Sequence, residues 1–141
     1  HNSVSVAYMG KVRMTMGKLN PINKDDLKVG DVVGIARKVW SGYGVGFRHV
    51  MVYPAKIIRI TPKRTKIETD IGKYNKYEVF YKYDSDAIKE SEMAKEFKTI
   101  KNGVYVIEDF KSRHGLTAIK DEDLDTLSEH INAVAEVLKR Y

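Results

Sequence analysis

The stretch AKIIRITPKRTKIETDIG, residues 55–72, decides the fold class of this sequence. Its first seven residues are rich in β-branched side chains and predict a strand. Pro62 then indicates a tight turn, because proline fixes φ and cannot donate to a ladder. Residues 66–71 alternate charged and uncharged side chains, which predicts a second strand with Ile67, Thr69 and Ile71 facing inward. The stretch therefore predicts two antiparallel strands with one buried face.

Strand patterns continue on both sides of this pair. LKVGDVV, residues 27–33, combines a turn with a β-branched run, and residues 50–53 and 77–83 also read as strands. Residues 72–76 are expected to form a turn. Four or five short strands within about sixty residues are typical of a small barrel or sandwich.

The two quoted segments, LKVGDVV and AKIIRITPKRTKIETDIG, are separated by a long excursion, and this order resembles the opening of SH3-like barrels of the KOW and Tudor type. The resemblance covers Leu27 to Tyr83 and rests on turns and alternation. It implies a small SH3-like β-barrel of about five strands over residues 17–84.

After Asp84 the pattern changes to helix formers. We expect a helix over residues 86–97, and then a short β-hairpin whose turn is Asn102-Gly103, a pair suited to two positive φ values. A C-terminal amphipathic helix is expected over 121–141, capped by Asp121. The predicted class is therefore α+β, with residues 85–141 packed on the barrel and residues 1–16 forming a tail.

An apolar stripe runs along the last predicted helix. Its members are spaced alternately three and four residues apart and so share one face: Leu124, Leu127, Ile131, Val134, Leu138 and Tyr141. Packing on the barrel is the favoured interpretation. The alternative is a homo-oligomer interface formed by Leu124, Leu127, Ile131, Val134 and Leu138.

Charge and composition limit the partners. The net charge is +6, and residues 11–64 carry twelve Lys/Arg against three Asp, so an anionic ligand is expected in the N-terminal half. The chain has no cysteine and no apolar run long enough to span a bilayer. We expect a cytoplasmic protein of a bacterial cell or an infected host cell. Residues 1–8 could be an addition made for expression.

A glycine-rich stretch, KVWSGYGVGFRHVMVYPAK, occupies residues 38–56. It lacks the Gly-Lys-Ser/Thr and the following helix of a phosphate loop, and also the spacing of a dinucleotide fingerprint. If it is extended, Tyr43, Val45 and Phe47 share one face. Aromatic rings and cations in one loop favour nucleic-acid binding without strict sequence preference, although a mobile hairpin with its rings tucked under the barrel is an equal alternative.

The predicted function is a non-catalytic nucleic-acid-binding module. Its RNA- or DNA-binding residues are expected to be Arg37, Lys38, Trp40, Tyr43, Phe47, Arg48, His49, Lys56, Arg59, Lys63 and Arg64.

Other functions remain open. One is a phage or mobile-element accessory protein that binds and inhibits or sequesters a host defence component, either a protein or a nucleotide ligand. Another is a toxin-like endoribonuclease, in which Arg48 would stabilise a phosphate and His49 would move a proton. The histidines show no ligand spacing, so we expect neither a metal nor a cofactor.

Overall fold

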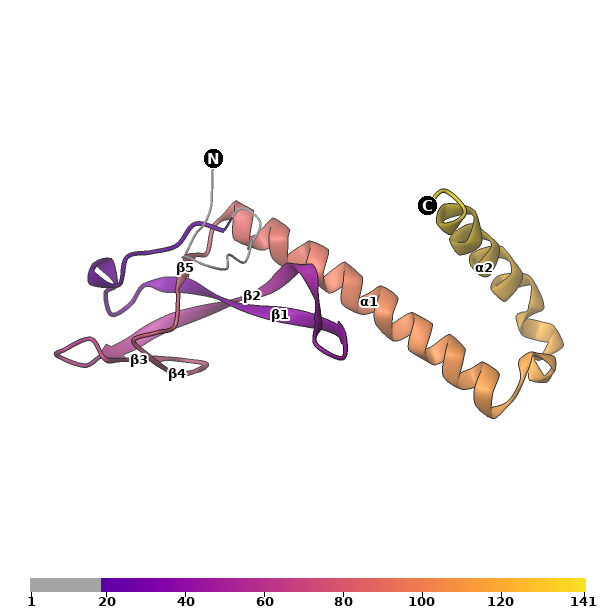
Figure 1. The fold of residues 1–141 in the computed structure, drawn as a ribbon, viewed down its shortest axis with the longest axis horizontal. Helices are drawn as coiled ribbons and strands as arrows, with labels where there is room; N and C mark the ends of the chain where they lie inside the picture. Colours follow the sequence, from indigo (N-terminus) through magenta and orange to yellow (C-terminus); the bar gives the residue numbers. More distant parts are fainter. Residues whose placement is uncertain (1–18) are drawn as a thin grey trace. The chain divides into compact units, whose positions relative to one another are not determined.

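A computed structural model describes residues 19–141, and the predicted tail at 1–16 lies outside the described residues. The chain divides into two compact units, whose described parts are residues 19–101 and 102–141. We call them the sheet domain and the helical segment. One helix, α1 (Ser85–Arg113), contributes residues to both (Figure 1).

The sheet domain is built on five antiparallel strands. They are β1 (Val32–Gly42), β2 (Val45–Ile60), β3 (Lys66–Thr69), β4 (Gly72–Asn75) and β5 (Tyr81–Lys82), in the spatial order β4-β3-β2-β1-β5. A short 3-10 helix, η1 (Lys24–Asp26), precedes them. The α+β class is confirmed. The edge strands β4 and β5 do not pair with each other among the described strands, so the sheet is not closed, and a barrel is not confirmed.

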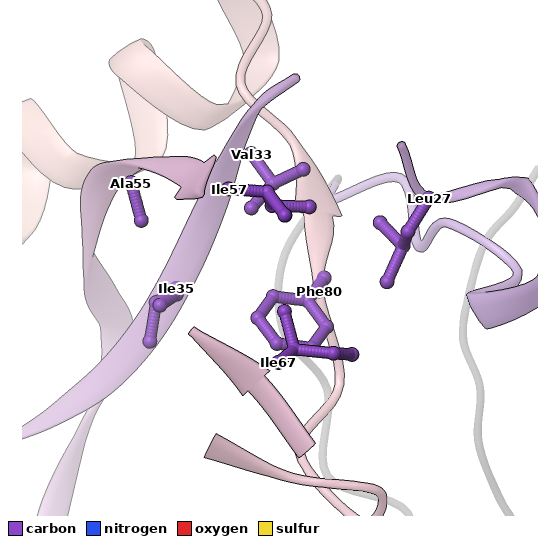
Figure 2. Close-up of a cluster of buried hydrophobic side chains, with 7 residues drawn as sticks. All are labelled: Leu27, Val33, Ile35, Ala55, Ile57, Ile67 and Phe80. Carbon is purple, nitrogen blue, oxygen red and sulfur yellow. The ribbon is translucent and has the colours of Figure 1, made fainter. Parts of the chain in front are cut away.

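The main hydrophobic core is formed by the strands together with the chain segments that precede β1 and β5. Figure 2 shows its seven fully buried side chains, which come from the residue after η1, from β1, β2 and β3, and from the approach to β5: Leu27, Val33, Ile35, Ala55, Ile57, Ile67 and Phe80. Each fully buried aliphatic or aromatic side chain contributes about 1.5–3 kcal/mol. These contacts between residues distant in sequence stabilise the sheet domain.

Helix α1 begins with a capped end and packs on the β1–β2 hairpin. The Ala87 N–H donates to Asp84 Oδ1 at 3.0 Å, which satisfies one of the free donors of the first turn. Ala87 and Ala94, both fully buried, face β2. Their small side chains allow close approach, and Val39 and Met51 complete the packing around Ala94.

The strands differ from expectation in three places. Strand β2 is continuous and contains Pro54, where two separate strands were expected. Residues 72–75 form β4 instead of a turn, and only Tyr81–Lys82 of the predicted strand at 77–83 is a strand. Ile67 and Thr69 are buried as predicted, but Ile71 is exposed because the chain turns after Thr69.

The predicted β-hairpin at Asn102-Gly103 is wrong. Both residues lie inside α1, which runs on to Arg113. An Asn-Gly pair favours a hairpin only between strand-forming flanks, and here Lys, Glu, Ala and Met precede it. A glycine in a helix costs about 1 kcal/mol relative to alanine, which a 29-residue helix can absorb. The helix ends where Gly115 takes a positive φ of 82°.

The helical segment also contains η2 (Leu116–Ala118), η3 (Asp121–Asp123) and α2 (Leu124–Leu138). The final helix is confirmed. It begins later than predicted, at Leu124, and ends earlier, at Leu138. The cap prediction is wrong: Asp123 occupies the N-cap position and makes no side-chain cap hydrogen bond. Packing of residues 85–141 as a whole on the sheet domain stays a prediction.

Candidate nucleic-acid interface

The turn between β1 and β2 presents an aromatic side chain at its tip. Tyr43 and Gly44 form a two-residue turn, and both have positive φ, 45° and 82°. Gly42 has a φ of 125°, and the β1–β2 register shifts on either side of Trp40. These glycines let the chain reverse tightly, so the Tyr43 ring projects fully into solvent.

Trp40 and Lys38 lie together behind this tip. The indole is 50% exposed, and Lys38 Nζ is 5.7 Å from its ring centre. Gly46 pairs with Trp40 across the hairpin, and a Cβ at Gly46 would lie 3.3 Å from Lys38 Nζ and 3.7 Å from the indole. Because Gly46 has no side chain, the Lys38 amine and the Trp40 ring can both lie against it.

Phe47 is used for packing. Its ring stacks on Phe97 of α1, with centroids 4.0 Å apart and planes at 4°, and the Arg48 guanidinium carbon lies 4.7 Å from its centroid. Phe97 covers one face of the ring, and the Arg48 guanidinium also lies against it, so Phe47 is engaged in packing. The exposed rings of the hairpin are those of Trp40 and Tyr43.

His49 is held by a buried carboxylate that the sequence analysis missed. Glu90 of α1 is 3% exposed. Its Oε1 is 2.9 Å from His49 Nδ1, and its Oε2 accepts the Val50 N–H at 3.0 Å. One residue on, Ser91 Oγ accepts the Val52 N–H at 3.1 Å. Strand β3 pairs with β2 only from Ile57 onward, so the earlier part of this edge of β2 has no partner strand. Glu90 and Ser91 accept hydrogen bonds from the backbone N–H groups that β3 leaves unpaired there.

A sequence signal for Glu90 exists. It lies three residues after Ala87 and four before Ala94, so it falls on the apolar face of the predicted helix. A carboxylate on such a face needs a partner, which could have been sought among the polar residues of the hairpin.

Lys101 is a second residue missed by the sequence analysis. Its Nζ donates to the Trp40 carbonyl oxygen from α1. The wrong hairpin at 101–104 hid this contact, because it removed Lys101 from the helix. The amine thus lies beside the aromatic end of the β1–β2 hairpin.

The positive charge of Arg37 is engaged in an ion pair. It forms a two-pronged pair with Glu78, at 3.0 and 3.1 Å, and this hydrogen bonding raises the pKa of the guanidinium. By contrast, neither Lys38 nor Arg48 forms an ion pair with any residue in the range 19–141. Both are exposed, so their charges are available to an anionic ligand.

The other four predicted cations lie at the far end of β2 or beyond it. Arg59 pairs with Glu68 at 2.8 Å, and Arg64 donates to the carbonyls of Lys24 and Leu27 at 2.8–3.1 Å. The other two, at positions 56 and 63, are exposed. Eleven residues separate Arg48 from Arg59, up to about 36 Å of extended chain. The structure therefore gathers only part of the predicted set, at the β1–β2 turn.

An open pocket of about 360 Å³ lies beside the Arg37–Glu78 pair and is lined by Ala36, Asn75, Tyr77, Glu78, Val79 and Tyr81. Burial raises the pKa of the Tyr81 hydroxyl. None of the eleven predicted binding residues lines this pocket.

Two further observations concern the described chain. Its His, Asp and Glu side chains nowhere form a group of three that could hold a metal ion. None of the helices within residues 19–141 combines the length and apolar composition needed to cross a bilayer.

The predicted oligomer interface lies entirely on exposed surface of α2. The exposed fractions of its side chains range from 40% to 60%: Leu124, Leu127, Ile131, Val134 and Leu138.

Comparison of the chain with known protein families, with curated protein sequences and with solved structures finds no significant match.

Proposed function

We propose that this protein binds single-stranded nucleic acid through the end of its β1–β2 hairpin. The observation that carries the proposal is the combination of two solvent-exposed rings, Trp40 and Tyr43, with two cations, Lys38 and Arg48. All four lie in an eleven-residue stretch, and neither cation forms an ion pair within residues 19–141. The rings can stack on bases of any identity, and the cations can neutralise phosphates.

The direct test is fluorescence anisotropy with labelled single-stranded RNA, single-stranded DNA and duplex DNA. We expect tighter binding to the single strands, with affinity falling steeply from about 50 to 200 mM salt as counterions rebind. Trp40 is the only tryptophan of the chain, so its fluorescence reports stacking directly. Absence of binding at about 50 mM salt contradicts the proposal.

Variants locate the surface. Stacking contributes about 1–3 kcal/mol per base, so Trp40→Ala and Tyr43→Ala should each weaken binding by roughly 5- to 150-fold. Arg48→Ala should reduce the salt dependence. Lys63→Ala is the matched control, because it removes an exposed charge at the other end of β2. Equal losses from Arg48→Ala and Lys63→Ala would place binding elsewhere.

A second candidate function is the endoribonuclease, and the Glu90 contact favours it. With Nδ1 held by Glu90, the His49 ring presents Nε2 as the nitrogen able to exchange a proton. Incubation of labelled RNA with the wild-type protein and with His49→Ala tests this role. Intact RNA, or cleavage that survives His49→Ala, excludes it.

The relationship to SH3-like barrels remains a proposal about the fold. In the strand order β4-β3-β2-β1-β5, the last strand along the chain, β5, pairs with the first, β1. This arrangement is expected of a barrel that is left open between β4 and β5, and it supports the proposal.

A further inference from the structure

The helical segment carries apolar surface without a core. None of its residues, 102–141, is buried, and all of them are described. Twelve of its large apolar side chains are at least 40% exposed. A 15-residue helix such as α2 is marginal in water unless its apolar face is covered. Nothing within the helical segment covers this face, so the segment needs a further protein surface to pack against.

The pattern on α2 is that of a helix-pairing seam. The stripe alternates spacings of three and four residues, which are the a and d positions of a heptad. The flanking e and g positions within the helix carry no formal charge at neutral pH: Ser128, His130, Ala135 and Val137. No charge at these flanking positions therefore opposes the approach of a like helix, and Ala135 and Val137 widen the apolar surface in the second half of α2.

We propose that two copies of this chain pair through α2, with the two helices antiparallel. The proposal is independent of nucleic-acid binding. Charge sets the direction: Asp121, Glu122, Asp123 and Asp125 surround the start of α2, whereas Lys139 and Arg140 follow its end. A parallel pair would bring eight carboxylates together. An antiparallel pair brings each acidic start beside the basic end of the second copy.

The spacing also allows a complete antiparallel register. When a positions lie level with d positions of the second copy, every member of the stripe gains a partner: Leu124 with Tyr141, Leu127 with Leu138, and Ile131 with Val134. No stripe residue is left over.

A stable interface buries about 800 Å² on each partner, and the exposed apolar side chains of residues 124–141 provide the central part of such a surface. The α2 stripe forms the centre, and the exposed apolar side chains at the end of α1, such as Val104 and Ile107, can extend it.

The first experiment measures the mass of the full chain by light scattering at increasing concentration. We expect twice the 16.1 kDa of one chain. Ile131→Glu places a charge at the centre of the seam and should give a monomer. Ala133→Glu is the matched control, since it adds the same charge on the opposite side of α2 and should leave the dimer intact. A monomeric wild-type protein at about 100 µM overturns the proposal, as does a dimer that survives Ile131→Glu.

The second experiment tests the orientation. The chain has no cysteine, so single cysteines can be spin-labelled cleanly. In an antiparallel pair, labels at Asp125→Cys lie about 22 Å apart along the axis, whereas labels at Asn132→Cys lie almost level. A parallel pair places both label pairs level, so the two positions give equal distances. Equal distances at both positions overturn the antiparallel arrangement. Because wild-type residues are retained along the seam, this measurement does not depend on a variant that weakens α2.

Discussion

The sheet domain and the helical segment are stabilised in different ways. The sheet domain buries three clusters of apolar side chains, drawn from the strands, from connecting segments and from the first half of α1. The helical segment buries no side chain. Its hydrogen bonds are mostly local, within α1, α2 and their turns, and its ion pairs join residues three or four apart.

This difference indicates that the sheet domain, and not the helical segment, is stabilised by side-chain burial within itself. Exposed i,i+4 pairs contribute about 0.3–0.5 kcal/mol, whereas each buried core side chain contributes several times more. Substitutions should therefore act strongly in the sheet domain and weakly in the helical segment, as long as the segment is measured without a partner.

The largest expected effect is at Phe80, which is 1% exposed in the main core. Phe80→Ala should lower the free energy of unfolding by about 3–5 kcal/mol, through lost burial and a cavity. Urea titration followed by Trp40 fluorescence reports the sheet domain. Leu127→Ala, on exposed α2, should leave that transition within about 0.5 kcal/mol. Similar losses from both variants would mean that the two regions share one core.

Next is the Glu90 carboxylate, which joins α1 to β2. Glu90→Ala leaves the Val50 N–H without its acceptor and should cost about 1–3 kcal/mol. Glu90→Gln keeps one carbonyl oxygen and should cost less. Amide hydrogen exchange at Val50 should accelerate more in the alanine variant, and unchanged exchange would show that the edge is protected by other groups.

Gly34 tests packing within the sheet. A Cβ there would lie 2.7 Å from Val52 Cγ1, so Gly34→Ala should destabilise by about 1–3 kcal/mol through overpacking. Removing the clashing atoms with Val52→Ala should make the double variant less unstable than the sum of the single changes. Additive losses in this double-mutant cycle would assign the effect to backbone geometry.

The smallest effect, with opposite sign, is expected at Gly103. It lies inside α1 with open space around its Cβ position. Gly103→Ala should stabilise the helix by about 0.5–1 kcal/mol, raising the helical circular dichroism signal and its thermal midpoint. A loss of helicity would mean that the Asn102-Gly103 pair does adopt another conformation in solution.

The comparison also shows where sequence reasoning worked. Local alternation found the turn at Pro62 and the buried side chains of Ile67 and Thr69, because both signals lie within a few residues. It misjudged Asn102-Gly103 because turn propensity was weighed without the helix on both sides. For the candidate site, it identified the exposed rings and cations of the hairpin but assigned equal roles to all eleven residues.

By itself, the sequence determined the α+β class, the amphipathic final helix and the concentration of positive charge in the first half, since periodicity and composition are local properties. Only the tertiary structure decided which of those charges are free. Arg37, Arg59 and Arg64 meet carboxylates or carbonyls that only folding brings close, and Glu90 reaches His49 across forty-one residues. Such contacts depend on strand pairing and on the position of α1, which no local pattern encodes.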